Sequence, residues 1–191
     1  MNRTKEQMKK LIISQDDCPE SPREWDNLGT MVCFHSRYEL GDRHDFSDPE
    51  DFKDFLESDD PIRLPLYLLD HSGLWMRSSR FMEYGGWDTS MVGFIYITKE
   101  QARKEYGWKV LTKARIEKIL TNLESEVKTY GQYLEGDVYG FSLIEETECT
   151  NCHQTVTEIL DSCGGFYGSD PEKNGMKEYI PNLDQYEIVY K

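Results

Sequence analysis

The chain has 191 residues, with 36 acidic and 22 basic side chains, and carries a formal net charge of −14. This sign argues against a general nucleic-acid binder and against docking on anionic lipid, because both need a basic face. Aromatic residues make up 13% of the chain, which argues against a disordered acidic tail and predicts one folded domain over residues 1–191. The sequence lacks a hydrophobic signal region and a membrane span, so we expect a protein of the cytoplasm.

The first half of the chain is predicted to be rich in strands. Residues 1–15 fit either a short helix or a first strand. Short apolar runs predict further strands at residues 30–35, 64–69 and 91–97, and a turn at residues 71–73 leads the chain into residues 74–76. Pro65 favours a sheet edge, because proline cannot donate a hydrogen bond to a neighbouring strand.

Residues 16–60 hold a net charge of −11, and ten of their acids lie in residues 39–60. Within this segment, Ser47-Asp-Pro-Glu50 has the spacing of a capping box and predicts a helix over residues 48–58. We assign the ten carboxylates to a partner-binding surface: Glu39, Asp42, Asp45, Asp48, Glu50, Asp51, Asp54, Glu57, Asp59 and Asp60. The simpler interpretation is a solvated face that keeps the protein soluble, and the sharper one is a surface that docks on a basic protein groove.

The second half predicts two helices followed by strands. Thr98-Lys-Glu-Gln101 is a capping box that opens one helix, and apolar residues at a spacing of three to four predict a long amphipathic helix over residues 112–136. Alternating residues at 138–146 and 155–163 predict an antiparallel hairpin, and residues 186–190 an edge strand. This order predicts an α+β fold in which an antiparallel sheet packs against one long amphipathic helix and two shorter helices.

Five cysteines at irregular spacing favour reduced thiols or a metal site over a disulfide framework. Cys149 and Cys152 lie at the predicted tip of the hairpin of residues 138–163, where two thiolates can face one tetrahedral ion. His153 is a candidate third ligand. The sequence therefore suggests a structural zinc site, and the alternative is a pair of surface thiols.

Two further groupings could support nucleophilic chemistry. Cys33 and His35 alternate along one predicted strand, and Asp70-His71 follows another. A buried free cysteine and histidines with backbone partners are the simpler interpretation. We therefore assign no catalytic residue.

Several stretches resemble a widespread family of uncharacterised bacteriophage and prophage proteins. The first is Ser21-Pro-Arg-Glu-Trp-Asp-Asn-Leu-Gly-Thr-Met-Val-Cys33, and the last are Asp161-Ser-Cys163 and Gly165-Phe-Tyr-Gly168. The resemblance covers about residues 20–168. It implies a protein of a mobile element that is made in the bacterial cytosol, and it implies no chemistry.

These observations lead to one main hypothesis and two alternatives. The main hypothesis is a phage-encoded counter-defence protein that inhibits a host CRISPR effector or restriction nuclease by electrostatic mimicry of nucleic acid. Its partner would be a host protein with a basic nucleic-acid-binding surface, without direct contact to nucleic acid or membrane. The first alternative is an enzyme or sponge for a small nucleotide signal, with tryptophans and His35 or His71 in its pocket. The second is a zinc-stabilised protein-interaction adaptor.

Overall fold

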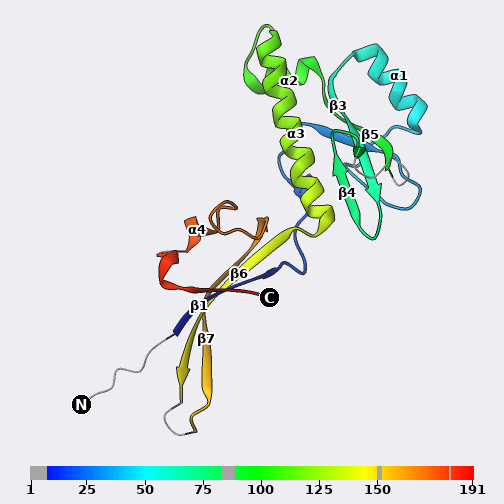
Figure 1. The fold of residues 1–191 in the computed structure, drawn as a ribbon. Coiled ribbons are helices and arrows are strands. Elements are labelled where there is room, and N and C mark those ends of the chain that lie inside the picture. The colour runs from blue at the N-terminus through cyan, green and yellow to red at the C-terminus, as the bar shows by residue number, and fades with distance from the viewer. Residues whose placement is uncertain (1–7, 83–88, 150–151, 181) are drawn as a thin grey trace. The chain divides into compact units, whose positions relative to one another are not determined.

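The computed structural model describes residues 8–82, 89–149, 152–180 and 182–191 (Figure 1). The chain divides into two compact units, and we call Met1–Glu20 with Gly136–Lys191 unit 1 and Ser21–Glu135 unit 2. Unit 2 is thus inserted into the sequence of unit 1. Helices and two mostly antiparallel sheets build the two units, which confirms the predicted α+β class.

Unit 2 contains a four-stranded antiparallel sheet in the order β2-β5-β3-β4. The strands are β2 (Thr30–Cys33), β3 (Ile62–Asp70), β4 (Leu74–Arg77) and β5 (Thr89–Ile97). Although β3 is an interior strand, β4 pairs only with its residues Tyr67–Asp70. Pro65 therefore lies where β3 has a partner strand on one side only, and there its missing N–H costs no ladder hydrogen bond.

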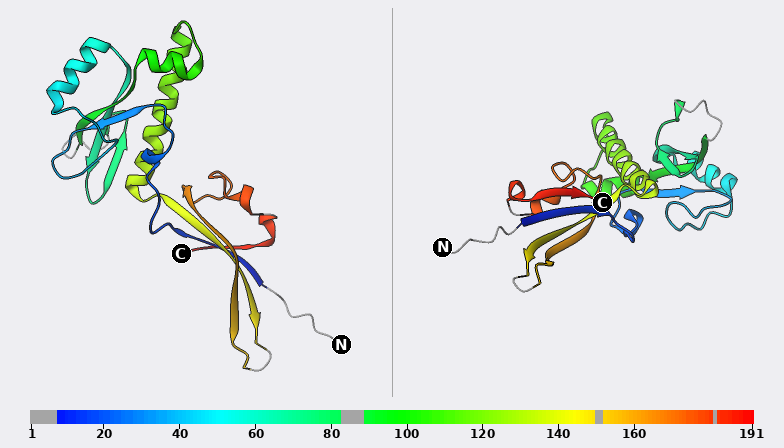
Figure 2. Two further views of the ribbon diagram at one scale, coloured as in Figure 1. Left: turned by 180° about the vertical axis from the view of Figure 1, so that it is seen from behind. Right: turned by 60° about the horizontal axis from the view of Figure 1, so that its bottom comes forward.

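The two faces of this sheet are covered by different helices (Figures 1 and 2). Helix α3 (Lys113–Glu135) buries Ile119, Leu123 and Val127 against one face, as the long amphipathic pattern predicted. Helix α2 (Lys99–Tyr106) begins at the predicted Thr98 capping box. Alternate strand residues point to opposite sides of a sheet, so apolar strand residues also reach the other face. Helix α1 (Pro49–Asp59) covers that face. A short 3-10 helix, η1 (Pro22–Glu24), precedes β2.

The start of α1 differs from the prediction in one detail. The N-cap is Asp48 rather than Ser47, and its carboxylate accepts from the backbone N–H groups of Glu50 and Asp51 at 2.9 Å each. Pro49 is the reason, because proline favours the first helical position and the residue before it then becomes the cap. Ser47 instead donates to the Asp51 carboxylate through its N–H and its hydroxyl.

Unit 1 contains a four-stranded sheet in the order β7-β6-β1-β8. The strands are β1 (Met8–Gln15), β6 (Val138–Glu148), β7 (Thr155–Tyr167) and β8 (Glu187–Tyr190). The described part of residues 1–15 is thus a strand, and β6 and β7 form the predicted antiparallel hairpin. β8 runs parallel to β1 at the sheet edge. A second core lies on one face, where β1 and β6 pack against the segment holding α4 (Met176–Tyr179) and the 3-10 helix η3 (Leu183–Gln185).

Within the described part of the chain, none of the helices combines the length and the apolar character needed to cross a membrane.

Candidate acidic docking surface

The acidic segment of residues 39–60 consists of the loop after β2 and helix α1. Nine of its ten acids belong to exposed residues, and Asp42 is the exception. Seven of them lie on α1 or at its ends, and we call this set the α1 surface: Asp48, Glu50, Asp51, Asp54, Glu57, Asp59 and Asp60. The structure thus brings most of the predicted carboxylates onto one rigid element.

Aromatic packing fixes which face of α1 points to solvent. Phe52 and Leu56 are 3% and 4% exposed, and they rest on the sheet together with the half-buried Phe55. The Phe55 ring meets the Tyr96 ring edge-on, with 5.2 Å between centroids. Burial of two or three such side chains stabilises the helix by several kcal/mol, at about 1.5–3 kcal/mol each. The opposite, acidic face is therefore held in a defined orientation.

Glu50, Asp54 and Glu57 form a stripe along this exposed face, because residues four and three apart lie above one another on a helix. Lys53 is the only base within α1, and its Nζ pairs with Glu50 at 3.2 Å. A hydrogen bond to Glu50, and then the charges of Glu50, Glu57 and Asp54, raise the pKa of Lys53. Across the described residues, Asp54 and Glu57 have no ion pair of their own.

The charge density of the α1 surface is close to that of a nucleic-acid strand. Residues 48–60 contain seven acids and one base, and they span about 18 Å at 1.5 Å per residue. One net negative charge then falls about every 3 Å along the helix axis. A single DNA strand carries one charge per about 3.4 Å of axis.

Negative charge is favourable at the N-terminal end of α1 and unfavourable at its C-terminal end. At the N-terminal end, Asp48 caps the helix and acidic residues are favourable toward the positive end of the helix dipole. The last turn contains no base, and Asp59 and Asp60 lie where the dipole favours cations. A hydrogen bond from Lys99 holds the pKa of Asp60 below its usual range, while Asp59 has no such partner among the described residues.

Asp42 has a structural task instead. Both of its oxygens accept hydrogen bonds from Arg23, at 2.8 and 2.7 Å, and one also accepts from the backbone N–H of Met31. Arg23 is 5% exposed, and it also donates to Glu126 on α3 and to the carbonyl of Gly29. Burial lowers the pKa of Arg23, but the hydrogen bonds to Asp42 and Glu126 outweigh this and raise it. The network ties the segment before β2 to α3.

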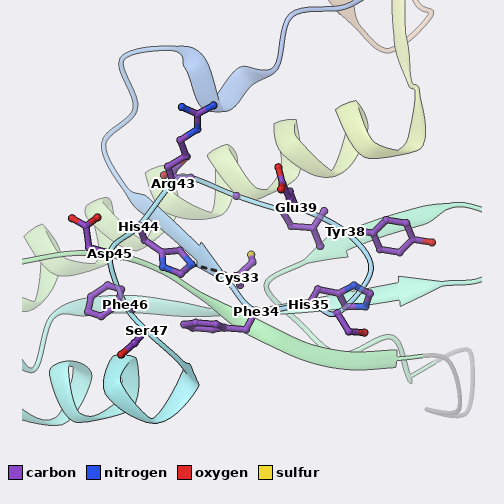
Figure 3. A pocket seen from close by; sticks show the side chains of 14 residues that line it. Cys33, Phe34, His35, Tyr38, Glu39, Arg43, His44, Asp45, Phe46 and Ser47 are labelled. Atoms are coloured by element: carbon purple, nitrogen blue, oxygen red, sulfur yellow. Dashed lines mark hydrogen bonds between the residues drawn. The ribbon is translucent and has the colours of Figure 1, made fainter.

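The loop of residues 34–47 encloses an open depression of about 1180 Å³ (Figure 3). The ring of His44 turns toward the carbonyl of Cys33, 3.4 Å from Nε2, whereas Arg43 and Asp45 point away from it. His35 stacks on Tyr38, with 5.1 Å between ring centroids. Cys33 is buried, and this burial raises the pKa of its thiol to about 12, so it is no nucleophile at neutral pH.

The other candidate residues are not gathered at this depression. His71 lies in the exposed turn between β3 and β4, and Asp70 contacts Arg37. The lining of the depression includes His35 but neither His71 nor a tryptophan. Trp87, one of the tryptophans proposed for the pocket, lies outside the described residues.

The predicted zinc ligands lie at the tip of the β6–β7 hairpin. Cys149 is half-buried, whereas Cys152 and His153 are exposed, and Nδ1 of His153 contacts the Glu148 carboxylate. Among the residues that the structure describes, no three His, Cys, Asp or Glu side chains are arranged to hold a metal ion. The zinc site therefore stays a prediction from sequence spacing.

Sequence reasoning missed two residues of this region. The sequence assigns no role to Arg23, whose buried ion pairs are with Asp42 and Glu126. The apolar run of residues 91–97 predicts a buried strand, yet Met91 is 55% exposed beside α1. No local pattern marks either role, because both depend on segments distant in the sequence.

Comparison with known proteins adds no relative: no protein-family model, curated protein or solved structure matches this chain.

Proposed function

We propose that this chain binds and inhibits a nucleic-acid-handling host protein, with the α1 surface occupying a basic groove. The observation that carries the proposal is Asp59, an exposed acid without an ion pair among the described residues, which lies in the last turn of α1 where the helix dipole disfavours its charge. A face that served only solubility could place its acids elsewhere at no such cost. The charge density, close to that of a nucleic-acid strand, supports the same conclusion.

The resemblance to bacteriophage and prophage proteins gives this activity its setting. In that setting the partner would be a CRISPR effector or a restriction nuclease of the bacterial host, encountered in the cytoplasm. Inhibition needs no catalysis by this chain, because occupying the groove excludes the nucleic acid. Screening by salt should weaken the complex, since the charges concerned are exposed.

The test compares two triple variants with the same change in net charge. Glu50→Lys, Asp54→Lys and Glu57→Lys reverse the stripe, while Glu100→Lys, Glu105→Lys and Glu117→Lys reverse exposed acids on α2 and α3. DNA cleavage by a panel of purified restriction nucleases and CRISPR effectors is measured at 50 and 300 mM NaCl. The stripe variant should lose inhibition and the control variant should keep it. Equal inhibition by both would contradict the proposal.

The depression of residues 33–47 supports one second candidate, a binding site for a small nucleotide signal. Its size is sufficient for a nucleotide, and His35, Tyr38 and His44 offer ring faces and nitrogen atoms. Mass spectrometry of nucleotides before and after incubation with the protein would reveal turnover or capture. The zinc-stabilised adaptor is tested by native mass spectrometry, and by the melting temperature of a Cys149→Ser, Cys152→Ser variant.

A further inference from the structure

An apolar groove lies directly beside the α1 surface, between α1 and β5. Its volume is about 470 Å³, and its walls are formed by Phe52 and Leu56 of α1 and by Phe94 of β5. Met91 also belongs to the lining, and this residue is more than half exposed. The lining runs along α1 from Pro49 to Glu57, a length of about 12 Å at 1.5 Å per residue. The groove is therefore long enough for about two turns of a second helix.

A β-bulge in β5 exposes Met91 at this place. Leu66 pairs with Gly93 and Tyr67 with Met91, so Val92 is the extra residue of the bulge. Strict alternation would place Val92 on the same face as Phe94, but it is buried in the core under α3. The bulge thus turns Val92 away from the sheet face that α1 covers, and it leaves Met91 beside the groove.

Acidic side chains line the groove on the α1 side. Glu50 and Glu57 of the stripe belong to the lining. Two bases also line the groove: Lys53 pairs with Glu50, and Arg63 donates to the carbonyl of Leu56, so Glu57 is the lining acid without an ion pair among the described residues. Arg63 also lies over the Phe94 ring, 5.9 Å from its centroid. A partner segment meets an apolar floor with carboxylates along one side.

Exposed charges alone explain fast docking better than tight binding. A single exposed ion pair contributes about 0–1 kcal/mol, and complementary charge acts mainly on the association rate. Binding energy concentrates where an apolar side chain fills a pocket that excludes water. The α1 surface has such a groove at its side.

We propose that this groove binds an amphipathic basic helix of the inhibited protein. Its apolar side chains, three and four residues apart, lie on Met91 and Phe94, while its lysines and arginines face Asp54 and Glu57. A helix fits this place better than an added strand, because one wall of the groove is a helix and the backbone of β5 beside Phe94 already pairs with β2 and β3. The inference rests on the proposed function and specifies which part of the partner α1 engages.

The test uses two synthetic 18-residue peptides with the same positive charge. One carries leucines at a spacing of three and four between lysines and arginines, and the other has glutamine at each leucine position. Binding is measured by calorimetry in 150 mM NaCl for the full chain and for two variants. Met91→Glu places a charge in the groove, and Val110→Glu makes the same charge change at a site 62% exposed in the loop between α2 and α3.

The full chain should bind the leucine peptide at least tenfold more tightly than the glutamine peptide. Met91→Glu should remove this preference, although its added negative charge would strengthen a purely electrostatic complex. Val110→Glu should keep the preference, and unchanged melting temperatures will show that both variants are folded. A wild-type chain without preference, or a Met91→Glu variant that keeps it, overturns the inference.

The stripe variant Glu50→Lys, Asp54→Lys, Glu57→Lys separates failure of the inference from failure of the proposed function. If it loses both peptides while Met91→Glu binds like the wild type, the α1 surface acts by charge alone. If it binds both peptides like the wild type, the proposed function itself fails.

Discussion

Arg23 shows how much a single residue of this chain determines. Its guanidinium joins a loop carboxylate, a helix carboxylate and a backbone carbonyl, all from one largely buried position. A lysine would keep the charge but lose the planar fork that bonds both oxygens of Asp42. A residue to which the sequence assigns no role therefore has a definite structural task.

We predict that Arg23→Lys lowers the free energy of unfolding by about 2 kcal/mol, because charged hydrogen bonds in a buried site are lost. Urea unfolding followed by circular dichroism measures this. Glu50→Gln is the control, since it breaks an exposed pair with Lys53 and should leave the urea midpoint almost unchanged. Equal midpoints for both variants would show that the network contributes little.

Cys33 makes a prediction about pH and reactivity. Burial raises the pKa of its thiol to about 12 in the folded chain, against 9.0 ordinarily. Above pH 9 the unfolded chain ionises this thiol and the folded chain does not, so the Cys33 contribution to stability falls between pH 9 and about 12. At pH 8, iodoacetamide should modify Cys152 and Cys163 before Cys33, as read by mass spectrometry. Rapid modification of Cys33 in the folded protein would contradict its burial.

At the scale of elements, α1 combines a sequence that favours helix with a charge distribution that partly opposes it. The same substitution at its two ends separates these effects. Asp48→Asn keeps a good cap but removes a favourable charge, and Asp59→Asn removes an unfavourable one.

We predict that Asp48→Asn destabilises the fold and that Asp59→Asn stabilises it, each by about 0.5 kcal/mol at low salt. Thermal unfolding in 10 mM buffer measures the two shifts, and 1 M NaCl should reduce both. Two shifts of the same sign would remove the dipole argument from the proposed function.

Elements with local signals were predicted well from the sequence, and those that depend on distant segments were not. The Thr98 capping box and the spacing of Ile119, Leu123 and Val127 are encoded within one turn or a few turns of helix. The cap at Asp48 could also have been found, because Pro49 marks the first helical residue. The bulge that exposes Met91 depends on how β5 pairs with β3, which no local pattern contains.

For the candidate site the same division holds. The carboxylates of α1 were predicted to be exposed because Phe52, Phe55 and Leu56 define the buried face. That Asp42 would turn inward could not be read from the acidic run, since its partner Arg23 lies 19 residues earlier and Glu126 lies 103 residues beyond Arg23.

For the whole molecule, the insertion of unit 2 into unit 1 is the main organising fact. Unit 1 has 15 acids and 7 bases, and unit 2 has 21 acids and 15 bases, so both are acidic. Length and composition suggested one domain, but each unit has a hydrophobic core of its own. The α1 surface and its groove lie entirely in unit 2.

We predict that residues 21–135 fold alone, because they form one continuous segment whose core is contributed by its own strands and helices. A cooperative thermal transition and dispersed amide resonances in an NMR spectrum would establish this. The fragment should also keep the leucine-peptide preference. A fragment without a cooperative transition would show that unit 2 needs unit 1 to fold.

The parallel pairing of β1 with β8 has a mechanical consequence. A force applied before β1 and after β8 pulls these neighbouring strands along their length in opposite directions. The pairs from Lys10 with Glu187 to Ile13 with Tyr190 are then loaded together in shear, rather than opened one after another. Both points of attachment belong to unit 1, so tension reaches unit 2 only after the pairing between β1 and β8 has broken. In a stretching experiment, unit 1 should rupture first, and the surface on α1 should stay folded up to that point.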